Sequence, residues 1–206
     1  MPNWCSNTIT ITGGSNTIRT LWEDSQTALK DEKGEGTFGL LSAMSPEPDY
    51  AVTEVAPAIG EKKVMSDWWD WRVTNWGTKW DIDDEGLEFE DHGDGTATIS
   101  GYFDSAWSPP IEALNTFCED MDGVFCELYY HESGMTFVGY WSSEGGDDHY
   151  DYSDATSKTI RDIIPEYLDD HFDISGSMEM WEEEEAEDNR QAEKRGAYGA
   201  HEDAVN

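Results

Sequence analysis

Five of the ten tryptophans lie between residues 68 and 81, in the stretch WWDWRVTNWGTKWD. Exposed indole rings can stack on bases or sugars, and a groove that binds nucleic acid combines such rings with lysine and arginine. Only Arg72 and Lys79 accompany these rings, so nucleic-acid binding is disfavoured. We expect the two cations to pair with Asp70, Asp81 or an aromatic face.

A structural role for the tryptophans is the favoured interpretation. Helix-to-sheet packing requires large apolar side chains near a helix end, and a glycine is typical of the position where a helix stops. We therefore expect Trp76, Gly77, Trp80 and Trp107 to pack a helix onto a sheet. Trp4, Trp71 and Asn75 complete this structural motif.

Carboxylates are the other group with possible chemistry. DIDDEG (81–86) begins like a calcium loop, but His92 stands at the twelfth position, where a bidentate glutamate is needed. No zinc-ligand spacing, nucleophile elbow, phosphate loop or dinucleotide fingerprint is present in the sequence. We expect no metal, no cofactor and no enzymatic activity. A deep pocket lined by carboxylates, with Trp71 or Trp80 at its wall, would favour an enzyme instead.

The net charge is the most unusual feature. The chain has 46 Asp and Glu against 12 Lys and Arg, a formal charge of −34, and both halves share the excess. Such a field repels nucleic acid and anionic membranes. Three interpretations stay open. The first is solvation, either as adaptation to a salty environment or simply as a soluble acidic surface. The others are mimicry of duplex DNA with its charge every ~1.7 Å, and an acidic tail that alone binds one basic partner.

Three acidic clusters are the candidate partner-binding surface. Each would carry charge into contact with a basic protein. They are Asp81, Asp83, Asp84, Glu85, Glu88, Glu90 and Asp91; then Glu144, Asp147, Asp148, Asp151 and Asp154; and finally Glu182, Glu183, Glu184, Glu185, Glu187 and Asp188.

The sequence favours a cytoplasmic location. It contains no run of about twenty apolar residues, and its first residues, MPNWCSNTITITGG, have no basic and apolar leader regions. The three cysteines, Cys5, Cys118 and Cys126, include no C-x-x-C pair, which favours reduced thiols.

Periodicity predicts the elements. Polar and apolar side chains alternate over residues 5–12, which predicts a strand. Ser15 should begin a helix that runs to about residue 30, and residues 38–48 form a short apolar segment. Ser66 or Asp67 should cap a helix with Trp69, Val73 and Trp76 as its apolar stripe, and residues 78–82 should follow as an extended segment.

Later residues complete an α+β pattern. Residues 87–90 and 95–103 predict a hairpin, Pro109-Pro110 a helix start, and 124–132 and 135–141 two further strands. The order predicts a ferredoxin-like antiparallel sheet with helices on one face. We place this domain at 1–145 and an acidic, mainly helical extension at 146–206. In the extension, a helix over 157–171 should kink at Pro165, another should span 178–195, and the end should be disordered.

The motifs MPNWCSN, DWRVTNWGTKWD (70–81) and SAWSPPIEAL (105–114) resemble the phage Api92-like, or YubB-type, ferredoxin-like family. The resemblance covers about residues 1–142 and leaves the acidic segment beyond 145 outside. It implies a ferredoxin-like fold and a phage or plasmid origin, and it implies no catalytic role.

These observations favour one function. We expect a non-enzymatic phage or plasmid accessory protein that binds and inhibits a basic host protein, a nucleic-acid-binding or defence component, through a DNA-mimicking acidic surface. The alternative is an acidic accessory or structural domain whose charge reflects a salty environment. Neither direct nucleic-acid binding nor membrane binding is expected.

Overall fold

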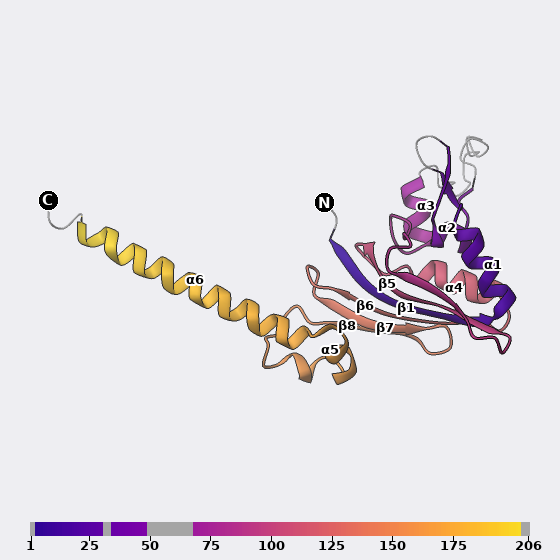
Figure 1. Ribbon diagram of the computed structural model, residues 1–206. Coiled ribbons are helices and arrows are strands. Elements are labelled where there is room, and N and C mark those ends of the chain that lie inside the picture. The colour runs from indigo at the N-terminus through magenta and orange to yellow at the C-terminus, as the bar shows by residue number, and fades with distance from the viewer. Residues whose placement is uncertain (1–2, 31–33, 49–67, 203–206) are drawn as a thin grey trace, which may run out of the picture. The chain divides into compact units, whose positions relative to one another are not determined.

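The computed structural model describes residues 3–30, 34–48 and 68–202 (Figure 1). The chain forms two compact units, Met1–Asp151 and Tyr152–Asn206. The expected helix cap at Ser66 or Asp67 lies outside the described residues.

A six-stranded antiparallel sheet forms the first unit. Its strand order is β4 (Leu87–Asp91), β5 (Thr96–Ala106), β1 (Trp4–Gly14), β6 (Phe125–Glu132), β7 (Phe137–Ser142) and β8 (Gly146–Asp151). Helix α1 (Ser15–Ser25) connects towards β4, and α4 (Ile111–Asp120) connects β5 to β6. The order β4-β5-β1-β6 with two crossover helices is the ferredoxin-like arrangement, so the predicted α+β fold class is confirmed.

Alternation along the strands separates the two faces of the sheet. On β1, Ile9 and Ile11 are fully buried, whereas Thr8 and Thr10, which alternate with them, are only partly buried. Ile9 is level with Gly101 of β5 and Leu128 of β6. Because side chains of one strand alternate between faces, the apolar set points to the helices and the hydroxyl set to the opposite face.

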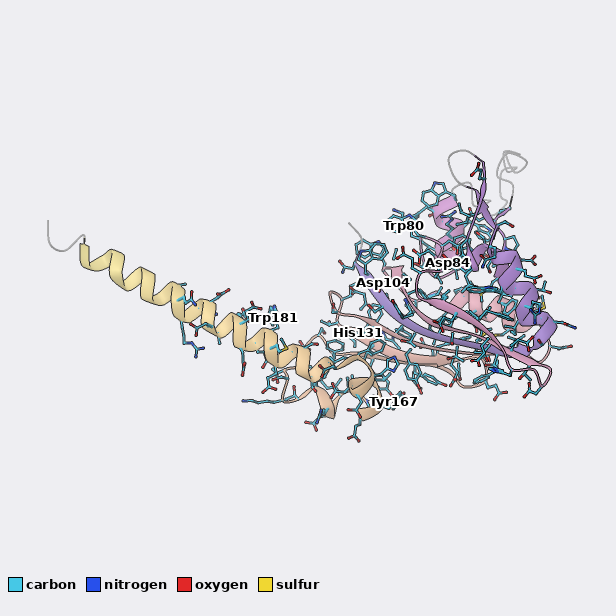
Figure 2. All side chains as sticks on the ribbon, viewed as in Figure 1. Trp80, Asp84, Asp104, His131, Tyr167 and Trp181 are labelled. Carbon is cyan, nitrogen blue, oxygen red and sulfur yellow. The ribbon has the colours of Figure 1, made fainter. Side chains whose placement is uncertain are left out.

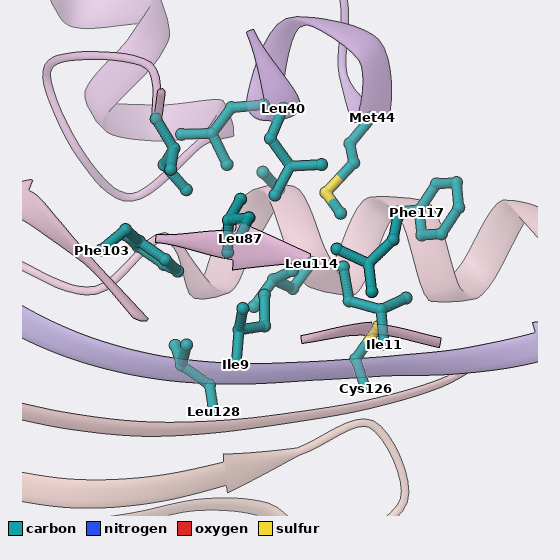
Figure 3. Packing of buried hydrophobic residues seen from close by; sticks show 14 of the residues in the cluster. Ile9, Ile11, Leu40, Met44, Leu87, Phe103, Leu114, Phe117, Cys126 and Leu128 are labelled. Atoms are coloured by element: carbon teal, nitrogen blue, oxygen red, sulfur yellow. The ribbon is translucent and has the colours of Figure 1, made fainter. Parts of the chain in front are cut away.

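The core lies between the sheet and the helices (Figure 3). Leu114 and Phe117 of α4 meet the apolar residues of the sheet, and the short helix α2 (Leu40–Met44) adds Leu40 and Met44. Helix α1 contributes Ile18 and Leu21 at helical spacing.

The connection between α1 and β4 departs from the prediction. Helix α1 ends at Ser25, earlier than expected, because Leu29–Lys30 (β2) pairs with Gly36–Thr37 (β3) as a small second sheet. Helix α3 (Trp68–Asn75) follows later and contains no buried residue. The predicted stripe is therefore wrong: Trp69 and Val73 are exposed, and only Trp76, just beyond the helix, is buried.

Residues 78–82 do not form the expected extended segment. Thr78 instead binds the end of β5, donating to the Ala106 carbonyl at 2.9 Å and accepting from the Ala106 N–H at 3.1 Å. Residues 146–151, which the sequence analysis placed in the extension, form β8 at the edge of the sheet. Their acidic composition hides the strand, because its pairing with β7 depends on main-chain groups.

The second unit is helical. It contains a 3₁₀ turn (Ile160–Asp162), α5 (Glu166–Phe172) and α6 (Ile174–Glu202). Pro165 separates the turn from α5, as predicted for a residue without an N–H. Helix α6 continues to Glu202, beyond the expected end at residue 195, and residues 203–206 lie outside the description.

Candidate functional site

The tryptophan-rich stretch sends one ring into the core. Trp76 is fully buried, and its indole N–H donates to the Ser45 carbonyl at 2.8 Å. Trp71 packs edge-on against it with ring centroids 5.9 Å apart, and the Asn75 amide holds the Trp71 carbonyl at 2.8 Å. Gly77 follows with φ of 84°, the left-handed conformation that was expected at the helix end.

The two cations of the stretch are held by its own rings. The Arg72 guanidinium lies 5.2 Å from the Trp68 ring centroid and 4.6 Å from that of Trp76. Its carboxylate partner is Glu47, at 2.7 Å from Nε, and not the expected Asp70 or Asp81. The Lys79 ammonium lies 4.6 Å from the Trp80 ring centroid. The expected aromatic contacts are therefore present for both cations.

Trp80 and Trp107 do not join the core as expected. Trp80 is 36% exposed and Trp107 46% exposed. Trp80 instead packs against Trp4 of β1, which is itself 48% exposed, with ring centroids 5.7 Å apart and planes inclined by 41°. Packing at the exposed start of β1 therefore leaves a substantial part of each ring accessible.

These rings border a pocket of about 330 Å³, named here the Trp4–Trp80 pocket. Its side chains come from the start of β1, the 80–86 segment and the end of β5. They are Trp4, Trp80, Asp81, Asp83, Glu85, Gly86, Tyr102, Phe103, Asp104, Ser105 and Ala106. Trp80 and Asp104 can be located in Figure 2. The pocket has the carboxylate lining and the Trp80 wall expected of an enzyme, but Trp4 and Trp80 remain partly exposed to solvent. It is therefore a surface hollow and not the deep pocket that the expectation specified.

Strand length explains why the pocket forms here. Strand β4 pairs with β5 only as far as Gly101, while β5 continues to Ala106. The Tyr102 N–H donates to the Gly86 carbonyl at 3.0 Å, which holds the 80–86 segment beside the part of β5 that extends past β4. Tyr102 is 70% exposed, so its ring adds to the accessible aromatic surface.

The carboxylates of the pocket differ in role. Asp81 accepts N–H groups of Leu41 and Ser42 at 2.7 and 2.9 Å, so it holds the first turn of α2. Burial raises the pKa of the Asp81 carboxyl, and these N–H donors act in the opposite direction. Asp104 accepts the Ser6 hydroxyl at 3.0 Å, and Asp83 accepts the Glu85 N–H at 3.2 Å. Asp83, Glu85 and Asp104 are exposed.

Most of the predicted first acidic cluster lies at one edge of the sheet. Glu88 and Glu90 lie on β4, on the face opposite the helices, by their register with Ser100 and Thr98. Asp84 is exposed in the preceding loop. Asp91 accepts the Ser15 hydroxyl at 2.6 Å and pairs with Arg19, and these contacts lower its pKa. Asp81 and Asp91 therefore serve the fold more than the surface.

The second acidic cluster belongs mainly to the opposite edge. Asp147, Asp148 and Asp151 are exposed on β8, and Glu144 is exposed in the turn before it. Asp154 is exposed in the second unit. Strands β4 and β8 are the two outermost strands, roughly 24 Å apart at about 4.8 Å per strand. The sheet therefore does not bring the first two clusters together.

A second hollow, of about 540 Å³, lies beside β8 and includes Trp107, Tyr130, Asp147 and His149 in its lining. The Tyr130 hydroxyl donates to Asp147 at 2.6 Å and lies 3.0 Å from His149 Nδ1. Burial and the Asp147 carboxylate raise the pKa of Tyr130, which keeps the phenol protonated. Trp107 has φ of 74°, and its N–H donates to the Asn3 carbonyl at 3.0 Å.

The third acidic cluster lies on α6. Glu182 accepts both the N–H and the hydroxyl of Ser157, at 2.8 and 2.7 Å. Glu187 contacts Arg190 and Gln191 at 3.0 and 3.2 Å. The remaining members are exposed to solvent: Glu183, Glu184, Glu185 and Asp188.

Neither of the two hollows could be predicted from residue spacing. Trp4 and Trp80 were both recognised as motif residues, but no spacing rule joins them to Tyr102 and Asp104. The register of β1 on β5, which sets Trp4 level with Ala106, produces that proximity. Likewise, only the β7–β8 pairing brings Asp147 beside Tyr130.

Within 3–30, 34–48 and 68–202, no three His, Cys, Asp or Glu side chains converge as ligands of a metal ion. No helix in the same ranges has the length and apolar character to span a membrane.

Comparison with known proteins identifies the family. Residues 75–195 match the family described as the ferredoxin-like domain in Api92-like protein, and because this is more than half of the chain, the protein belongs to that family. The crystal structure of protein api92 from Yersinia pseudotuberculosis is similar, with 11% sequence identity and a TM-score of 0.43 over 74% of this chain and 99% of that chain. None of the curated proteins matches.

The extent of the family match corrects one expectation. The match continues to residue 195, so the prediction that the acidic segment beyond 145 lies outside the family is wrong. Strand β8, helix α5 and helix α6 as far as residue 195 fall within the matched range.

Proposed function

We propose that this protein is a non-enzymatic phage or plasmid accessory protein that binds the basic surface of a nucleic-acid-binding or defence protein of the host. Its binding would exclude nucleic acid from that surface and so inhibit the host protein. The supporting observation is the charge of α6. Six carboxylates occupy the seven residues Glu182–Asp188, which span about 10.5 Å of helix axis at ~1.5 Å per residue.

This spacing supports mimicry of DNA. One carboxylate per about 1.8 Å of axis follows from the helical rise, and duplex DNA carries one charge per ~1.7 Å. A basic groove that binds DNA would therefore meet a similar line density of charge over this short segment. Arg190 is one nearby cation, and it is already paired with Glu187 at 2.8 Å.

The proposal assigns mimicry to α6 and not to a strip across the sheet. The acidic clusters of β4 and β8 are on opposite edges, so they do not add to one line of charge. Glu182 is anchored by Ser157. The exposed carboxylates after it have fewer constraints and are the groups proposed to contact the partner.

The Tyr130 hydroxyl in the second hollow has a structural role as a hydrogen-bond donor. Tyr130 acts as a hydrogen-bond donor to Asp147, and its raised pKa makes it a poor general base near neutral pH. The proposal therefore assigns no reaction to Tyr130, Asp147 or His149.

A charge-matched pair of variants tests the proposal. The first variant carries Glu183→Gln, Glu184→Gln, Glu185→Gln and Asp188→Asn on α6. The second carries Asp84→Asn, Glu88→Gln, Glu90→Gln and Asp148→Asn, which remove the same formal charge from the first unit. Each full chain is immobilised and exposed to host lysate treated with nuclease, and bound proteins are eluted with duplex DNA.

The wild type and the second variant should retain the same DNA-eluted proteins, and the α6 variant should lose them. Retention should fall steeply with salt, because binding releases counterions. Equal retention by both variants, or equal loss from both, would show that α6 has no special role. Bound proteins that duplex DNA does not elute would contradict mimicry.

A further inference from the structure

The Trp4–Trp80 pocket is a concave site that combines accessible aromatic rings with exposed carboxylates. We propose that this pocket binds the side chain of an arginine presented by another protein. The proposal rests on the proposed function only for the nature of the partner, a basic protein. The site itself lies wholly in the first unit and is independent of α6.

Aromatic rings form the walls. Trp4 and Trp80 meet at an inclined angle, and Tyr102 adds a third accessible ring from β5. The face of an aromatic ring is electrically negative and attracts cations within about 6 Å of its centroid. Trp80 already has such a contact, because the Lys79 ammonium lies 4.6 Å from its centroid. A second cation on an accessible ring face would make the same kind of interaction.

Carboxylates supply the charge. Asp83, Glu85 and Asp104 line the pocket with Asp81, and its lining residues include no lysine or arginine. The Ser6 hydroxyl and the Glu85 N–H each occupy one acceptor site, on Asp104 and Asp83 respectively. Because a carboxylate has about four acceptor sites, both groups keep capacity for a ligand. The lining is therefore complementary to a positive charge.

Size and shape favour arginine. A volume of about 330 Å³ suits one long side chain and is too small for a helix or strand. Guanidinium is planar, stacks on aromatic rings and pairs with a carboxylate through two hydrogen bonds. Lysine offers only a compact ammonium, and a sugar could stack on the same rings without using the negative charge. Arginine uses both properties of the pocket.

Calorimetric titration of the full chain with N-acetyl-arginine amide tests the proposal. N-acetyl-citrulline amide is the matched probe, because it has nearly the same shape without the charge. N-acetyl-lysine amide and methyl glucoside are two further probes, which test the alternative ligands lysine and sugar. We expect the arginine probe to bind with a Kd on the order of 1 mM, at least tenfold more tightly than the citrulline, lysine or sugar probes.

Two variants locate the binding. Trp80→Leu removes a wall, and the double variant Glu85→Gln with Asp104→Asn keeps the shape but removes two charges. Each should weaken arginine binding at least about fivefold. Trp181→Leu is the control, because Trp181 is also exposed and lies next to carboxylates on α6. It should leave the affinity unchanged.

Several outcomes would overturn the proposal. These are equal affinity for the arginine and citrulline probes, preference for the lysine or sugar probe, or an equal loss from Trp181→Leu. If Trp80→Leu loses its native circular dichroism, the double variant Glu85→Gln with Asp104→Asn alone tests whether the probe binds in this pocket. The four-site α6 variant described above should keep its affinity for the arginine probe, so failure of the α6 proposal and failure of this one are distinguishable.

Discussion

Gly139 allows the Tyr130 ring to cross β7 and reach β8. A Cβ atom at Gly139 would lie 2.2 Å from the Tyr130 hydroxyl oxygen and 2.7 Å from the Asp148 carbonyl. Both distances are far below van der Waals contact. The phenol reaches Asp147 on β8 because the residue between them on the sheet has no side chain. The hydrogen bond between Tyr130 and Asp147 therefore depends on a glycine in another strand.

We predict that Gly139→Ala destabilises the first unit by about 2 kcal/mol, the usual effect of excess volume in a packed site. Thermal melts followed by near-UV circular dichroism would measure the loss. Gly14→Ala is the control, because its Cβ would meet no atom closer than the Thr17 hydroxyl at 4.0 Å. If Gly139→Ala and the control have the same melting temperature, β7 and Tyr130 can move apart at little cost in stability.

At the scale of elements, the two edge strands provide a second explanation for part of the acidity. Strands β4 and β8 each have an unpaired edge in the described sheet. Charged side chains on edge strands oppose pairing with other chains. Glu88 and Glu90 on β4, and Asp148 on β8, have positions that suit this role.

We predict that replacing Glu88 and Glu90 with threonine increases self-association. Threonine favours strands and removes the repulsion between two β4 edges. Size-exclusion chromatography with light scattering should detect dimers or larger species. Glu183→Thr with Glu185→Thr removes the same charge from α6 and should leave the molecular mass unchanged. If both double substitutions increase self-association equally, the loss of net charge alone explains the effect.

Much of this fold could be predicted because its signals are local. Ile9 and Ile11 alternate with threonines, Pro110 precedes α4, and the glycines after His92 mark the β4–β5 turn. The candidate sites were less accessible, because they depend on register. Trp80 and Trp107 were assigned to the core on apolar character alone, but the short β4 leaves Trp80 at an edge. Strand β8 was hidden because acidic side chains give no apolar alternation.

At the scale of the whole molecule, repulsion among the carboxylates opposes folding. The formal charge of −34 is spread over both units and already counts every lysine and arginine as positive, so ion pairing leaves this excess unchanged. Screening should therefore stabilise the folded state over the range in which the Debye length falls to about 10 Å.

We predict that Tm rises by about 5 °C between low salt and about 0.2 M KCl and then stays nearly constant. Calorimetric scans at graded KCl would measure this. Potassium sulfate at equal ionic strength is the control, because sulfate adds a general effect on hydrophobic burial. A Tm that continues to rise steeply to about 2 M KCl would contradict simple screening. It would favour the alternative that the acidity reflects a salty environment.

The central position of β1 affects the order in which the sheet can be completed during synthesis. Strand β1 leaves the ribosome before the other strands of the sheet, and its partners β5 and β6 are much later in the sequence, with Ile9 facing Gly101 and Leu128. Domains fold as units while the chain emerges from its N-terminal end. The nascent chain must therefore keep one amphipathic segment soluble until most of the first unit has been translated. Threonines at alternate positions of β1, together with the acidic residues that follow, would limit aggregation during that interval.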